Sequence, residues 1–127
     1  MLQRSSAYYD TAVLLKNSKQ YNQSAVYFYY SIFQLMMHLL TIAMRPIPLD
    51  RQNILNEDSH KWIMHNIIDR MDNAKREKNL KEDFEFLFEK RHKADYEDRF
   101  VSEIECLEAE EVYNRMKRNL LQSFPTK

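Results

Sequence analysis

Glycine is absent from the 127-residue sequence, and proline occurs only three times. Glycine supplies the positive φ angles that tight hairpin turns require, so a chain without it is poorly suited to antiparallel sheets. The same absence excludes the glycine-rich loops that cradle phosphate in P-loop and dinucleotide-binding proteins. The composition therefore predicts an all-α protein.

Cysteine is almost absent as well, because Cys106 is the only one. A single cysteine excludes an intramolecular disulfide and a cysteine-rich zinc site, and it is typical of a reducing compartment. The first residues, MLQRSSAYYD, lack the apolar segment of a signal peptide. We therefore expect a cytoplasmic protein. Its formal net charge of zero gives no support for general binding to nucleic acid or membrane surfaces.

Charged side chains are missing between Lys19 and Arg45. Within residues 24–44 the polar side chains recur at steps of three and four, which places them on one stripe of a helix. The rest of that helix is apolar, so other helices must surround it. Its length would suit a membrane span, but its glutamine and histidine would be costly in lipid, so we expect no membrane insertion. The stripe consists of Tyr27, Ser31, Gln34, His38 and Thr41.

The remaining hydrophobic periodicity predicts four more helices, at about 6–19, 59–71, 80–96 and from 102 onward. Residues 45–58 form the longest irregular stretch, and 72–79 read as a charged linker. Ser102 and Glu105 have the spacing of a capping box, and Cys106 falls on a clean apolar stripe. Phe86 points away from the apolar face of its helix and is a candidate contact surface. We expect one domain over residues 1–127.

Arg91 and Asp95 continue the helix face of Phe84 and Phe88 beyond its apolar part. A charged pair in that position is costly unless the two groups meet each other or a ligand. One interpretation is an ion pair that fixes how two helices meet. The other is an arginine that holds phosphate, with Asp95 orienting the guanidinium. The spacing leaves both open.

The four histidines have no spacing typical of a metal site, so we expect neither a metal nor a cofactor. His60 lies at the start of a predicted helix, where the helix dipole favours neutral imidazole and attracts anions. An ordinary loop histidine is the alternative interpretation.

Three separated segments together resemble HEPN domains (higher eukaryotes and prokaryotes nucleotide-binding). AVYFYYSIFQLMMHLL at 25–40 resembles their long hydrophobic helix, and SHKW at 59–62 resembles the Ser/Thr-His-Lys signature that opens the next helix. RHKADYED at 91–98 resembles the R-x-x-A-D-Y element of small stand-alone prokaryotic members. The resemblance implies an up-and-down bundle of four long helices plus a shorter one. It also implies a homodimer that works with a minimal nucleotidyltransferase in a toxin–antitoxin or defence module.

Many HEPN proteins are metal-independent RNases that use an R-x4-6-H motif from two subunits. After Arg91, the histidine positions hold Tyr96, Glu97 and Asp98, so the motif is not intact and enzymatic activity stays open. Three functions remain: a protein that binds nucleotide or RNA phosphate in a polar cleft, a divergent RNase toxin, and a helical interaction module without a ligand.

The resemblance implies that the polar stripe of residues 24–44 faces the Arg91–Asp95 line, so that the central helix forms one wall of the cleft. The residues assigned to catalysis are Arg91, Asp95 and Tyr96. The residues assigned to ligand binding are His60, Tyr30 and Lys61.

Overall fold

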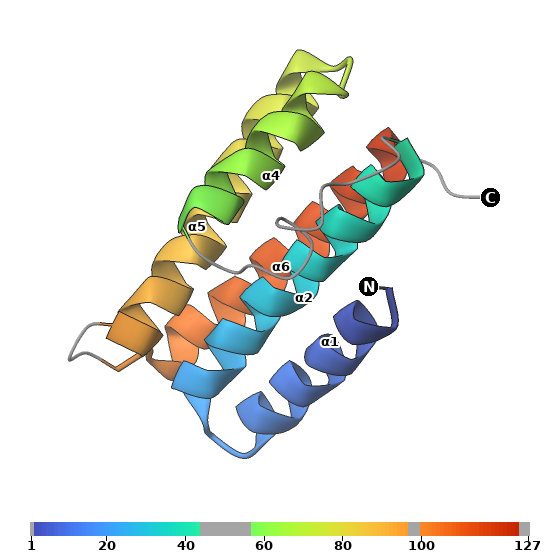
Figure 1. Ribbon diagram of the computed structural model, residues 1–127. Helices are drawn as coiled ribbons and strands as arrows, with labels where there is room; N and C mark the ends of the chain where they lie inside the picture. The colour runs from blue at the N-terminus through green and yellow to red at the C-terminus, as the bar shows by residue number, and fades with distance from the viewer. Residues whose placement is uncertain (1, 44–56, 97–99, 125–127) are drawn as a thin grey trace.

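The computed structural model describes residues 2–43, 57–96 and 100–124, and these residues form five α-helices with no strand among them (Figure 1). The prediction of an all-α protein is therefore confirmed for the described part of the chain. Four helices have 16 to 23 residues and one has 13. They are α1 (Leu2–Asn17), α2 (Tyr21–Ala43), α4 (Glu57–Asp69), α5 (Ala74–Tyr96) and α6 (Glu103–Ser123).

Helix α2 is the centre of the bundle, because it packs against each of the other four helices. Its side chains Phe28, Ile32, Phe33 and Met36 are completely buried. The central position predicted for residues 24–44 is confirmed, and burying its apolar surface is the main driving force of the fold. None of the helices in the described ranges combines the length and apolarity that crossing a membrane demands.

The helix directions follow an up-and-down order except at one connection. Figure 1 shows α1 antiparallel to α2, α4 antiparallel to α5, and α5 antiparallel to α6, whereas α2 and α4 run in the same direction. Residues 44–56, which include most of the predicted irregular stretch 45–58, lie outside the described residues. Helix α4 begins at residue 57, two residues before the predicted start.

The turn between α1 and α2 closes α1 with a Schellman motif. The backbone N–H of Gln20 donates to the carbonyl of Leu15 over 2.8 Å, and that of Lys19 donates to the carbonyl of Lys16 over 3.0 Å. Lys19 has a φ of 63°, the left-handed conformation that glycine normally supplies. Since the chain has no glycine, Lys19 adopts this conformation at a cost of about 1–2 kcal/mol.

Helix α5 is longer than predicted. It begins at Ala74, so most of the predicted charged linker at 72–79 is helical. The side chain of Asn73 caps the first turn, because its Oδ1 accepts from the backbone N–H of Arg76 over 3.0 Å. Lysine, arginine and glutamate are good helix formers, so a solvated first turn needs no apolar periodicity.

Helix α6 begins as predicted. Ser102 is its N-cap, and the reciprocal bonds with Glu105 complete the capping box. Cys106 is fully buried, which confirms it as a core residue. Phe86 differs from its prediction: its ring is half-buried against the core, and the ammonium group of Lys90 lies 5.0 Å from the ring centroid.

Ser31, in the middle of the polar stripe of α2, faces α1 and α6, so the expectation that the stripe faces the Arg91–Asp95 line is wrong for Ser31. The hydroxyl of Ser31 donates to the carbonyl of Ser5 over 2.6 Å, and the hydroxyl of Ser5 donates to the carbonyl of Ser31 over 2.8 Å. The Tyr113 hydroxyl of α6 lies 2.8 Å from the Ser31 Oγ. These small polar side chains satisfy one another, which allows α1 and α2 to approach closely.

Candidate functional site

The best-defined polar cluster lies where α2, α4 and α5 meet. Its centre is Tyr29, which is 1% exposed. The Tyr29 hydroxyl lies 2.9 Å from Nδ1 of His60, and Nε2 of His60 lies 2.8 Å from Oε1 of Glu85. A carboxylate only accepts, so Nε2 carries the proton donated to Glu85. When the imidazole is neutral, its Nδ1 therefore has no proton and accepts from the phenol.

Two phenyl rings of α5 hold the imidazole of His60. The ring centroids of Phe84 and Phe88 lie 4.2 Å and 4.1 Å from it, and the Tyr29 ring stacks on Phe84 at 5.4 Å. Phe84 and Phe88 are one helical turn apart, so their rings can lie on both sides of a side chain inserted from α4. His60 is therefore fixed both by its hydrogen bonds and by aromatic packing.

Arg91 also lies next to the Tyr29 ring. It is 5% exposed, its Nε lies 3.3 Å from Oδ2 of Asp95, and both groups are on α5, four residues apart. The guanidinium carbon lies 5.5 Å from the Tyr29 ring centroid and 5.8 Å from that of Tyr30, which is within the range of cation–π attraction. Arg91 thus continues the buried face of α5, as the spacing predicts, whereas Asp95 is exposed and meets Arg91 at the edge of that face.

The electrostatics of the cluster keep Tyr29 neutral. Burial raises the pKa of the Tyr29 phenol above its ordinary value, and the nearby guanidinium of Arg91 opposes that increase only in part. Tyr29 is thus a hydrogen-bond donor at neutral pH. Glu85 and Asp95 supply negative charge at the edge, with side chains that are 48% and 32% exposed.

The predicted site residues are only partly brought together. Arg91, Asp95 and Tyr30 are neighbours, and His60 joins them through Tyr29. Lys61 follows His60 on α4, and its side chain is exposed. Tyr96 is the last residue of α5, and its side chain lies outside the described residues.

Sequence reasoning missed Tyr29 and Glu85. Tyr29 lies in the most apolar part of α2, where an aromatic residue indicates ordinary core packing. Glu85 is one of many acidic residues on a solvated helix. The one available signal was indirect: a histidine at the start of a helix, followed by apolar residues at helical spacing, needs buried polar partners.

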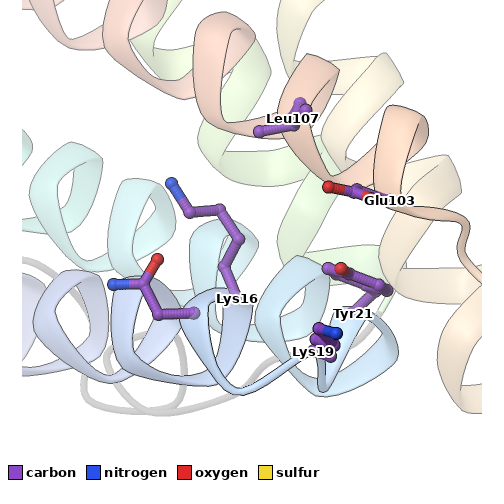
Figure 2. Close-up of a pocket in the computed structure, with 6 residues that line it drawn as sticks. Lys16, Lys19, Tyr21, Glu103 and Leu107 are labelled. Atoms are coloured by element: carbon purple, nitrogen blue, oxygen red, sulfur yellow. The ribbon is translucent and has the colours of Figure 1, made fainter.

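A separate pocket of about 300 Å³ lies between the α1–α2 turn and the start of α6 (Figure 2). It contains none of the predicted site residues. The Lys16 ammonium is 2.7 Å from Oε1 of Glu110, so its charge is already paired. Positive and negative groups balance in this pocket, which gives it no clear preference for an anion or a cation. Its lining residues are Lys16, Asn17, Lys19, Tyr21, Glu103 and Leu107.

In the three described ranges, no group of three or more His, Cys, Asp or Glu side chains is arranged to hold a metal ion. Comparison of the chain with protein-family models, with curated proteins and with solved structures gave no match.

Proposed function

We propose that this chain is a HEPN-like helical protein that binds the phosphate of a nucleotide or of RNA at Arg91. Arg91 is the single feature that carries the proposal. Its guanidinium is permanently charged, and a carboxylate and two aromatic rings fix its orientation. An arginine oriented in advance loses little conformational freedom when it binds a phosphate, which favours binding.

Asp95 and Tyr30 have supporting roles in this proposal. Asp95 orients the guanidinium from its Nε edge, and its partial exposure places the ion pair near the molecular surface. The Tyr30 ring covers part of the guanidinium from α2. Partial shielding from water strengthens the attraction between the cation and an incoming phosphate.

The binding experiment measures the anisotropy of a fluorescein-labelled oligouridylate titrated with the purified protein. Arg91→Ala is expected to weaken binding about tenfold or more, because a charge-assisted contact is lost. Arg91→Lys retains the positive charge but not the planar guanidinium with its paired donors, so its affinity should lie between those of the wild type and Arg91→Ala. Arg118→Ala removes an exposed arginine of α6 and is the matched control. Equal affinities of Arg91→Ala and Arg118→Ala, with both folded by circular dichroism, would reject the proposal.

The partners in this proposal are a second copy of the chain and a minimal nucleotidyltransferase, in a toxin–antitoxin or defence module of a prokaryotic cytoplasm. They rest on the resemblance of the three sequence segments to HEPN proteins. A neighbouring open reading frame with a G-S-x-D nucleotidyltransferase motif would support the module. Light scattering that shows a monomer at micromolar concentration would contradict the homodimer.

A divergent RNase is the second candidate. The observation that favours it is the hydrogen-bonded series Glu85–His60–Tyr29, which has the order of an orienting carboxylate, a base and a hydroxyl next to Arg91. The test is expression of wild type and Arg91→Ala in a bacterial host. If the protein is an RNase, only expression of the wild type should slow growth and cleave cellular RNA. Because the proposed RNase needs no metal, EDTA should leave RNA cleavage by the purified protein unchanged. Equal growth and intact RNA in both would exclude this activity.

A further inference from the structure

Three tyrosines form a continuous aromatic surface beside Arg91. Tyr8 comes from α1, and Tyr27 and Tyr30 come from α2. Their ring centroids are 5.6 Å apart for Tyr8 and Tyr27, 5.8 Å for Tyr8 and Tyr30, and 5.9 Å for Tyr27 and Tyr30. Each ring thus contacts the other two, so the three act as one unit, the tyrosine triad.

The triad differs from the aromatic core in its exposure. Phe28, Tyr29 and Phe33 are at most 1% exposed, whereas all three triad residues are only half-buried. Part of the triad is therefore open to solvent. Tyrosine rings at such a position offer π-faces together with hydroxyl groups for a ligand that is both aromatic and polar.

The triad adjoins Arg91, the cation of the proposed phosphate site. The Tyr30 ring belongs to the triad and also lies 5.8 Å from the guanidinium carbon of Arg91. A ligand that reached both would carry an anionic group at Arg91 and flat rings over the tyrosines. Single-stranded nucleic acid has this chemistry, since successive bases stack on aromatic side chains while basic groups hold the backbone.

We propose that Tyr8, Tyr27 and Tyr30 form a stacking platform for the bases of single-stranded RNA whose phosphate is bound at Arg91. This inference rests on the proposed function and adds a second contact to it. Stacking is tolerant of sequence because every base has a π-face. The platform therefore selects unpaired strands over duplexes rather than one base over another.

The experiment compares two oligomers of six units: hexauridylate and a ribose–phosphate oligomer without bases. Wild type should bind hexauridylate at least about tenfold more tightly, because stacking adds to the phosphate contact. Tyr27→Leu should weaken hexauridylate binding about tenfold and leave binding of the base-free oligomer unchanged. Tyr27→Phe retains the ring and should restore affinity.

Tyr9→Leu is the matched control. Tyr9 is also a half-buried tyrosine of α1, but its ring contacts are with the core residues Tyr113, at 5.1 Å, and Phe28, at 6.1 Å. The Tyr9 change should leave the ratio of the two affinities as in wild type. Thermal unfolding of each variant checks that it is folded at the assay temperature.

The two proposals fail in different ways. If wild type binds both oligomers equally and Arg91→Ala weakens both, the phosphate site stands and the platform is rejected. If Tyr27→Leu and Tyr9→Leu lower the affinity ratio equally, the triad has no special role and the platform is rejected as well. If wild type binds neither oligomer, the proposed function is wrong, and the platform is lost with it.

Discussion

Nδ1 of His60 and the hydroxyl of Tyr29 lie 2.9 Å apart, inside the protein and between two helices that run in the same direction. His60 is 2% exposed, and its imidazole lies between the rings of Phe84 and Phe88. It belongs to α4, the shortest described helix, and connects that helix to both α2 and α5. The imidazole therefore acts as an anchor of α4, whatever further role it has.

Removal of this anchor should destabilise the fold. His60→Ala leaves a cavity between the two phenyl rings and deprives the buried Tyr29 hydroxyl of its partner, so we expect a loss of about 2–4 kcal/mol. Tyr29→Phe makes no large cavity but removes the partner of the buried His60 Nδ1, so it should cost about 1–3 kcal/mol. His65→Ala is the control, because His65 has a 75% exposed side chain. Urea unfolding gives the three values, and similar losses for His60→Ala and His65→Ala would contradict the anchoring role.

Lys19 provides a test in which the protein should become more stable. Its φ of 63° is unfavourable for any residue with a Cβ atom, so Lys19→Gly should raise the free energy of unfolding by about 1 kcal/mol. The gain is reduced by the greater freedom of glycine in the unfolded chain. Lys78→Gly, in the exposed part of α5, should have the opposite effect, a loss of about 1 kcal/mol. Changes of the same sign in urea unfolding would disprove the role of the left-handed turn.

The reciprocal bonds between Ser5 and Ser31 join α1 to α2. Each hydroxyl donates to the other residue's backbone carbonyl, which alanine also has, and the two Oγ atoms lie 3.3 Å apart. Ser31→Ala leaves the buried Ser5 carbonyl and Tyr113 hydroxyl with one partner fewer, so it should cost about 1–3 kcal/mol. Because only the contact between the two Oγ atoms depends on both side chains, a double-mutant cycle of Ser5→Ala and Ser31→Ala should give a coupling energy of about 0.5 kcal/mol. A coupling energy of about 2 kcal/mol or more would contradict this interpretation.

The sequence was sufficient to predict the existence and order of the helices. The charge-free stretch identified α2 as the central helix, because an apolar surface of that extent must be covered on all sides. The capping box at Ser102 and the burial of Cys106 followed from local spacing. The start of α5 did not, because its first turn is solvated and carries no apolar periodicity.

The orientation of α2 relative to its neighbours could not be predicted from its own sequence. A helix that is apolar around most of its circumference has several equivalent ways to face its partners. Ser31 was therefore expected near Arg91, but it binds Ser5 and Tyr113. Arg91 contacts both Asp95 and Tyr30, as the predicted site requires. The contact with Asp95 could be predicted because both residues lie on one helix, four positions apart. The contact with Tyr30 was inferred from the resemblance to HEPN domains. The bonds from His60 to Tyr29 and Glu85 connect three helices, and no periodicity in one segment encodes such a link.

Glu105 makes the stability of the fold sensitive to acid. Its carboxylate accepts from Lys93 over 2.8 Å and from Lys90 over 2.9 Å. These two bonds, of which the one from Lys93 has the larger effect, lower the pKa of Glu105 from its ordinary 4.5 to about 2. A carboxyl with a lowered folded-state pKa stabilises the protein above its unfolded pKa. That contribution should decrease as pH falls below about 4.5 and be lost near pH 2.

Glu105→Gln isolates this effect, because glutamine also completes a capping box but cannot pair with the lysines. We expect the variant to be less stable by about 1–2 kcal/mol at pH 7, since the carboxylate is partly solvated and water weakens its attraction to the two lysines. The difference from wild type should shrink as pH falls toward 2. Glu108→Gln, at an exposed position of the same helix, should change stability by less than about 0.5 kcal/mol at either pH. Urea unfolding at pH 7 and pH 2.5 tests both variants, and a Glu105→Gln difference that does not depend on pH would mean that the lysines do not stabilise the ionised carboxylate.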